Sequence, residues 1–262
     1  MTGRLRSLER AHGARLGVFA YDSPTGRAVA YRADELFPLC STFKTLAVAA
    51  VLRDLGTAFL AHRIRYTARD VAASGYAPVT GLPANLAAGM TVADLCAAAL
   101  DHSDNTAANL LLRELGGPAA VTRFCRSIGD GVTRLDRWEP GLNSAEPGRT
   151  TDTTSPRALA LSYARLALGP ALAPPDRRRL TAWLLGNTTG AGRLRAGLPT
   201  SWTTADKTGT GHYGTTNDAA LTWPPGRPPL VLAVLSAKPD PAAPPDEPLL
   251  AATATLLATA LS

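Results

Sequence analysis

The stretch WTTADKTGTGHYGTTNDAALTWPPGRPPLVLAVLSA, residues 202–237, decides the fold class. It is rich in threonine, valine and tryptophan, which favour strands, and glycines or paired prolines interrupt it. We expect three successive antiparallel strands over residues 202–209, 214–223 and 229–237. An alanine- and leucine-rich helix follows over about 247–260.

The N-terminal segment has the same strand character. Residues 14–21 and 28–32 predict two strands joined by a turn at 22–26. Helical patterns fill the chain between the two strand regions, and their cap and proline signals predict helices at 41–52, 91–100, 105–115, 118–127, 156–169 and 175–185.

Strands at both ends with helices between them predict an α+β fold, with an antiparallel sheet from both termini, flanking helices and an inserted all-α subdomain. We expect residues 1–262 to form a single domain. Its sheet subdomain would comprise residues 1–34 plus 187–262, and its all-α subdomain residues 35–186. A functional site is expected in the cleft between them.

Composition excludes several classes of function. The net charge of +6 comes from scattered arginines without interleaved aromatic residues, so we expect no nucleic-acid partner. No apolar run is long enough for a membrane helix, and the first 17 residues lack the apolar segment of a signal peptide. The four histidines lack ligand spacing, so we expect no metal and no other cofactor. The cysteines, Cys40, Cys96 and Cys125, are expected to be buried thiols.

Lysine is scarce in this chain, where only three of the 27 lysine and arginine residues are lysines. Arginine stays protonated in proteins, whereas lysine can lose its proton and act as a base. One lysine, Lys44, follows Ser41 by three residues at the start of a predicted helix. This spacing brings the hydroxyl and the amine onto one helical face. Taken alone, however, the pair is better explained by a capping serine and a surface lysine, because S-x-x-K is short and common.

Two further short motifs have the same ambiguity. Ser103-Asp104-Asn105 lies between two predicted helices, where it could serve only as a helix cap. Lys207-Thr208-Gly209-Thr210 lies on a predicted strand, where lysine and threonine could bind a carboxylate and glycine would admit a ligand. The purely structural alternative is an edge strand whose lysine prevents pairing with another chain.

Together, the three motifs resemble the S-x-x-K, S-D-N and K-T-G signature of class A β-lactamases and penicillin-binding proteins. The resemblance extends to the segment Arg137-Trp-Glu139-Pro-Gly-Leu-Asn143, which is similar to the E-P-x-L-N segment of the class A Ω-loop. In the family pattern Asp152 would pair with Arg137. The long polar stretch 136–154 is therefore interpreted as a functional loop.

The resemblance implies hydrolysis of β-lactams, namely penicillins and cephalosporins, through an acyl-enzyme on Ser41. Lys44 or Glu139 would take the serine proton, Ser103 would pass a proton to the lactam nitrogen, and backbone N–H groups of Ser41 and Thr210 would hold the oxyanion. Glu139 with Asn143 would then activate water for deacylation. The implied substrate-binding residues are Asn105, Lys207, Thr208, Gly209, Arg193 and Tyr76.

Two other functions stay open at this point. A D-alanyl-D-alanine peptidase or esterase would share Ser41, Lys44 and Lys207, and a β-lactam sensor would acylate once and stop. Glu139 argues against both, because it provides a base for deacylation. The resemblance also implies a monomer that is secreted or periplasmic, whereas a chain without a signal peptide could be cytoplasmic. Gly211 stands where some carbapenem-hydrolysing relatives have a bridging cysteine, which favours other substrates.

Overall fold

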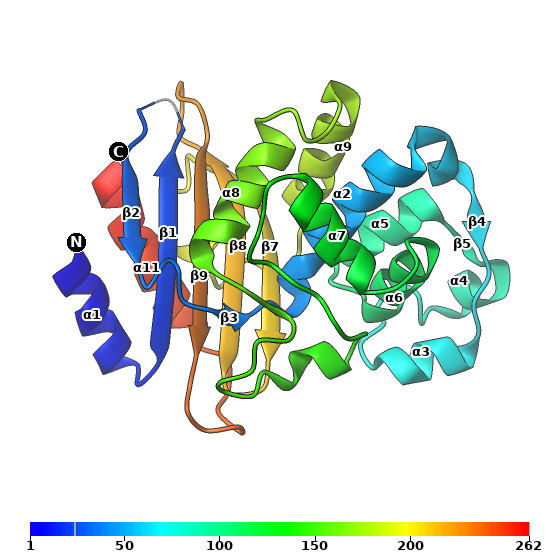
Figure 1. The fold of residues 1–262 in the computed structure, drawn as a ribbon, viewed down its shortest axis with the longest axis horizontal. Coiled ribbons are helices and arrows are strands. Elements are labelled where there is room, and N and C mark those ends of the chain that lie inside the picture. Colours follow the sequence, from blue (N-terminus) through cyan, green and yellow to red (C-terminus); the bar gives the residue numbers. More distant parts are fainter. Residues whose placement is uncertain (24, 262) are drawn as a thin grey trace.

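In the computed structural model, which describes residues 1–23 and 25–261, a five-stranded antiparallel sheet stands beside a helical region (Figure 1). The strand order is β2-β1-β9-β8-β7. The strands are β1 (Arg15–Asp22), β2 (Ala28–Tyr31), β7 (Thr203–Gly211), β8 (Thr215–Trp223) and β9 (Leu230–Ala237). The predicted α+β class is confirmed, and the predicted strands agree with the observed ones to within about two residues. The predicted turn at 22–26 includes Pro24, which lies outside the described residues.

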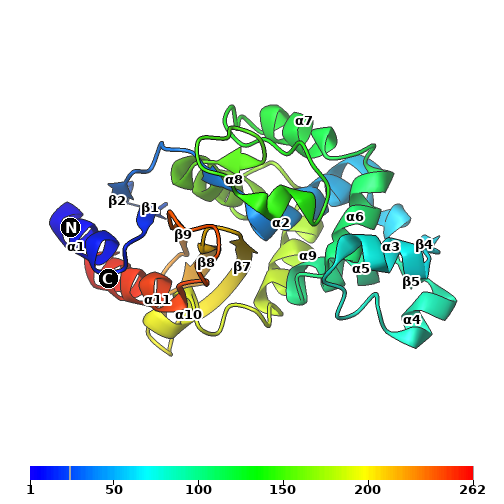
Figure 2. The same cartoon turned by 90° about the horizontal axis from the view of Figure 1, so that it is seen from below.

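Helices cover both faces of the sheet (Figure 2). One face packs against the two terminal helices, which bury leucines such as Leu5 and Leu257 against β1 and β9. The other face packs against a larger core built around α2 and α8. The helices that border the sheet are α1 (Thr2–Ala11), α10 (Leu194–Gly197) and α11 (Glu247–Leu261) on the first face, and α2 (Phe43–Ala50), α8 (Pro156–Ala167) and α9 (Pro174–Leu185) on the second.

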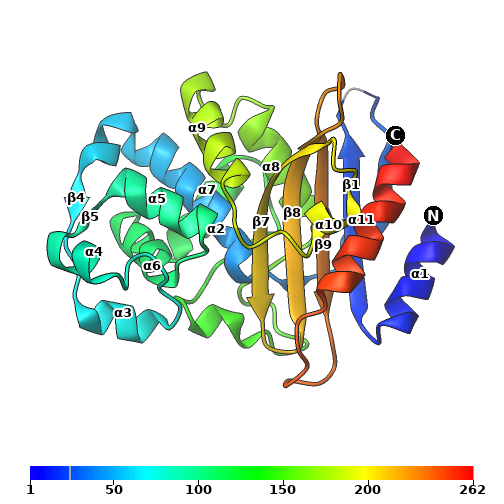
Figure 3. The same ribbon diagram turned by 180° about the vertical axis from the view of Figure 1, so that it is seen from behind.

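The remaining helices form the region beside β7, which Figure 3 shows from behind. They are α3 (Ala68–Ser74), α4 (Pro83–Ala88), α5 (Val92–Asp101), α6 (Asn105–Glu114) and α7 (Ala119–Ser127). Short strand pairs link parts of this region: β3 (Phe37–Pro38) pairs with β6 (Thr153–Thr154), and β4 (Arg63–Ile64) pairs with β5 (Met90–Thr91). The predicted helix at 41–52 begins as a 3-10 turn over Cys40–Thr42 and ends as a π-helical turn over Val51–Leu55.

Four helices were not predicted from the sequence: α1, α3, α4 and α10. They are short or weakly apolar, and α1 fully buries only Leu5. Short helices are marginal in isolation, so tertiary packing decides whether they form. A capping box did mark the start of α3, where Thr67 and Asp70 exchange hydrogen bonds.

Candidate active site

Ser41 lies in the 3-10 turn that leads into α2, at the point where this helix meets β7. Its hydroxyl donates a hydrogen bond to Oε1 of Glu139 at 3.2 Å. The sequence spacing predicted a serine hydroxyl close to Lys44, and both side chains do share this carboxylate, since Lys44 Nζ lies 3.1 Å from the same oxygen. The three residues are buried. Serine, lysine and glutamate therefore form one connected group.

Lys44 is surrounded by acceptors. Its Nζ donates to the backbone carbonyl of Ser103 and to Oδ1 of Asn105, both at 2.7 Å. With Glu139 these make three close partners, and the Ser103 hydroxyl is a longer fourth contact at 3.4 Å. Burial is the largest influence on this amine and lowers its pKa, while the neighbouring Glu139 carboxylate works in the opposite direction. Lys44 therefore gives up a proton more readily than an exposed lysine does.

The residues of the Ser103-Asp104-Asn105 motif have two different roles. Asp104 is the N-cap of α6 and accepts from the backbone N–H of Ala107 at 2.8 Å. The interpretation as a helix cap is therefore correct for this residue. Ser103 has a φ of +57°, and its hydroxyl accepts from Lys207 Nζ at 3.0 Å. The cap thus presents Ser103 and Asn105 to the site.

The loop over residues 136–154, called the Ω-loop from here, carries Glu139 and Asn143. Asn143 Nδ2 donates to Oε2 of Glu139 at 2.5 Å, so the amide and the carboxylate are in direct contact. The predicted pair is confirmed at the neck of the loop, where Arg137 Nε lies 2.5 Å from Oδ2 of the buried Asp152. The Glu139–Pro140 peptide bond is cis.

Asn109 holds the Ω-loop at its other side. Its Oδ1 accepts from the backbone N–H of Glu139 at 3.0 Å, and its Nδ2 donates to the backbone carbonyl of the same residue at 3.0 Å. The sequence analysis missed Asn109. The available signal was a polar amide in the apolar interior of the helix predicted at 105–115.

β7 is the edge strand of the sheet that faces the helical region. Lys207 is fully buried, and Thr208 forms a hydroxyl–hydroxyl hydrogen bond of 2.5 Å with Thr189. The structure adds a second reason for glycine at position 209. A Cβ there would lie 3.2 Å from both Cys40 Cβ and the Leu39 carbonyl oxygen, so the glycine admits the turn that carries Ser41 as well as any ligand.

Arg193 is buried, so a surface role for it is excluded. Its Nη1 donates to the carbonyls of Gly209 and Asn217 at 2.8 Å each, and its Nη2 donates to Thr210 Oγ1 at 2.7 Å. Its Nε also pairs with Glu247 of α11 at 3.1 Å. Because β7, β8 and α11 together fix this guanidinium, it adds positive charge at the end of β7 without needing to move.

The cleft itself has a volume of about 370 Å³. Tyr76 stands at its rim with 55% of its surface exposed, and its carbonyl accepts from the backbone N–H of Asn105 at 2.8 Å. Nine of the twelve predicted site residues line this cleft, and the other three, Lys44, Glu139 and Lys207, contact residues that line it. The lining residues are Ser41, Tyr76, Ser103, Asn105, Asn143, Thr189, Arg193, Thr208, Gly209 and Thr210.

Burial also shapes the charges beneath the cleft. It lowers the pKa of Lys207 well below its usual value, and the nearby Lys44 lowers it further. Behind β7, burial raises the pKa of Asp218, and the neighbouring Asp206 carboxylate adds to this effect. All three cysteines are buried, as predicted, and burial raises the pKa of the Cys40 thiol beside Ser41.

Known proteins are similar to this chain in sequence and fold. The model of the β-lactamase enzyme family matches residues 2–261. A β-lactamase of Streptomyces lavendulae is 66% identical over 98% of this chain and 85% of its own length. The carbapenem-hydrolysing β-lactamase KPC of Klebsiella oxytoca is 50% identical over 95% of this chain and 85% of its own length. The solved β-lactamase from Streptomyces albus G superimposes with a TM-score of 0.98 at 65% identity, covering 100% of this chain and 99% of that one. The chain therefore belongs to the β-lactamase enzyme family, as a class A serine enzyme that hydrolyses β-lactams.

Proposed function

We propose that Ser41 is the nucleophile and that Glu139 drives deacylation. The observation that carries this assignment is the direct contact of the Ser41 hydroxyl with the Glu139 carboxylate, which Asn143 holds from the other side. A base must lie within hydrogen-bond reach of the proton that it removes, or reach it through one water. Glu139 satisfies this requirement for the serine and for a water beside it.

In the binding step, Lys207, Thr208 and Arg193 attract the carboxylate of the β-lactam. Charge-assisted hydrogen bonds of this kind are about twice as strong as neutral ones. Tyr76 packs against the substrate at the rim, while Asn105 and Gly209 border the cleft and leave room for the substrate's amide side chain.

In the acylation step, the Ser41 oxygen bonds to the lactam carbonyl carbon, and the C–N bond then breaks. Backbone N–H groups of Ser41 and Thr210 stabilise the developing oxyanion. The serine proton passes to Lys44 or to Glu139. Ser103, which contacts both Lys207 and Lys44 through its hydroxyl, carries a proton to the departing nitrogen.

In the deacylation step, Glu139 removes a proton from water as that water attacks the ester carbonyl. The Ser41–acyl bond breaks and the serine oxygen regains a proton. The ring-opened acid then leaves the cleft. This step separates the enzyme from a D-alanyl-D-alanine peptidase or a sensor, because those would lack a base at the position of Glu139.

The deciding experiment is steady-state hydrolysis of a chromogenic cephalosporin, with intact mass recorded during turnover. We expect sustained hydrolysis that Ser41→Ala abolishes. One equivalent of colour with a persistent covalent mass on the protein would overturn the role of Glu139. Penicillins, which carry the same carboxylate, should be hydrolysed as well.

The cellular setting is a proposal from the family resemblance. We propose a monomeric enzyme that is secreted or periplasmic and whose partners are β-lactams alone. No helix in the described part of the chain could span a membrane. Light scattering on the purified protein tests the monomer, and β-lactamase activity in culture supernatant against cell lysate tests the location.

A further inference from the structure

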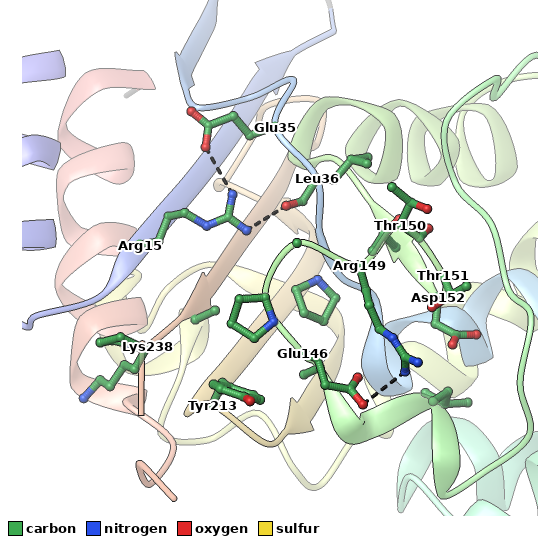
Figure 4. A pocket seen from close by; sticks show the side chains of 18 of the residues that line it. Arg15, Glu35, Leu36, Glu146, Arg149, Thr150, Thr151, Asp152, Tyr213 and Lys238 are labelled. Atoms are coloured by element: carbon green, nitrogen blue, oxygen red, sulfur yellow. Dashed lines mark hydrogen bonds and ion pairs between the residues drawn. The ribbon is translucent and has the colours of Figure 1, made fainter. Parts of the chain in front are cut away.

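A second cavity, of about 680 Å³, lies against the Ω-loop (Figure 4). It is bounded by the start of β1, the chain around β3, Leu142 and residues 145–153 of the Ω-loop, and the chain that follows β9. Its volume is within the range of about 300–1,000 Å³ that is typical of small-molecule sites. None of its lining residues lines the Ser41 cleft.

We call this cavity the loop cavity. Its walls are largely apolar. Prolines from three separate segments contribute, together with Tyr213 from the turn between β7 and β8. Leu36 is 36% exposed at the same place, an unusual position for a large aliphatic side chain. Rigid apolar walls of this kind fit a compact ring system better than a flexible polar ligand.

Arg15 supplies a stacking surface. Its guanidinium carbon lies 3.8 Å from the centre of the Phe37 ring, which covers one face of the guanidinium group. The Arg15 side chain remains 41% exposed and lines the cavity. Planar guanidinium groups stack on aromatic rings, so the uncovered face is suited to a second ring.

The lining has one more cation than acid, and each of its four cations is already paired with a carboxylate. Four lining residues are cationic and three are acidic: Arg15, Arg137, Arg149 and Lys238 against Glu35, Glu146 and Asp152. Arg149 enters from the Ω-loop and pairs with Glu146 at 3.0 Å, with 50% and 39% of the two side chains exposed. Exposed pairs of this kind contribute little, about 0–1 kcal/mol, so a ligand carboxylate can take the place of Glu146.

We propose that the loop cavity is a binding site for small aromatic carboxylates. The ring lies between the apolar walls and stacks on Arg15, and the carboxylate binds Arg149. This site is distinct from the β-lactam cleft. Occupants also contact Leu142, whose neighbour Asn143 faces the cleft, so the two sites share the Ω-loop as their common wall.

The test uses the intact protein and 1-naphthoate, titrated by calorimetry. We expect one saturable site with an affinity about tenfold higher than for the neutral 1-naphthalenemethanol or the cationic 1-naphthylmethylamine, since a charge-assisted hydrogen bond is the difference. The KM for a chromogenic cephalosporin should stay constant at saturating naphthoate. Equal affinities for the three probes, or a KM that rises in proportion to the naphthoate concentration, would overturn the proposal.

Variants locate the site. Arg149→Gln should weaken naphthoate binding by about tenfold through loss of the charged donor. Arg123→Gln, an exposed arginine on α7, makes the same charge change away from the cavity and should leave binding unchanged. Ala237→Trp fills the cavity from the end of β9 and should abolish binding. If that variant does not fold, the Arg149 and Arg123 pair still decides, because equal affinities in both would refute the site.

Discussion

The two walls of the active cleft are built in opposite ways. β7 is held by the backbone ladder with β8, which pairs all nine residues from Thr203 to Gly211. The Ω-loop, in contrast, is held mostly by side chains, with Arg137 and Asp152 at its neck and Asn109 on the backbone of Glu139. A ladder tolerates a change of side chain, whereas a loop fixed by side chains does not. Substitutions on the two walls should therefore have different consequences.

The largest effect is expected at the Ω-loop carboxylate. Glu139→Gln keeps the shape of the side chain but removes the base, so we expect kcat to fall by about 10²–10⁴-fold and the acyl-enzyme to accumulate. Intact mass during turnover measures the trapped species. Glu114→Gln, a matched change at the end of α6, should leave kcat close to the unaltered value. Normal turnover by Glu139→Gln would show that another group activates the water.

The next effect tests how the loop is fastened. Asp152→Ala leaves Arg137 without its buried partner, so we expect the free energy of unfolding to fall by about 3–5 kcal/mol and deacylation to slow. Thr204→Ala on β7 removes only the hydrogen bond to Thr222, at 2.9 Å, and should cost about 1 kcal/mol. Urea unfolding with single-turnover kinetics measures both. Equal costs at the two positions would contradict the contrast between ladder and loop.

A third prediction concerns charge on β7. Because the pKa of Lys207 is lowered well below 10.5, its ammonium form is lost as pH rises through that lower value. The KM for a penicillin should then rise by up to about tenfold per pH unit on the alkaline side. Lys207→Arg keeps its charge, so its KM should stay flat over the same range even if it is higher at neutral pH. Parallel pH profiles in both proteins would remove Lys207 from carboxylate binding.

The smallest effect is expected at the rim. Tyr76 belongs to neither wall and comes from the chain between α3 and α4. Tyr76→Ala should raise KM by about two- to fivefold through lost ring contact, without changing kcat. Leu82→Ala, another exposed side chain nearby in sequence, is the control. A fall in kcat would instead place Tyr76 in the chemistry.

More of the β7 side of the cleft than of the Ω-loop side could be predicted from the sequence. Strand-favouring residues, the glycine and proline turns between them and the K-T-G motif located the ladder, because these signals lie within short stretches of the chain. Asn109 and the loop cavity left no such pattern, since both depend on where residues distant in sequence come together. The short helices α3 and α4 were missed for the same reason, as their stability comes from packing. Glu139 was found only because the loop resembles a known segment.

The position of β7 at the edge of the sheet has a consequence for solubility. An open strand edge can pair with a strand of another molecule and seed aggregates. Here the turn before α2 and helix α9 pack against β7, so little of its edge is open to another chain. The remaining stretch borders the cleft, whose lining includes Tyr76 and, from the Ω-loop, Asn143. The cleft that admits an antibiotic thus also limits self-association.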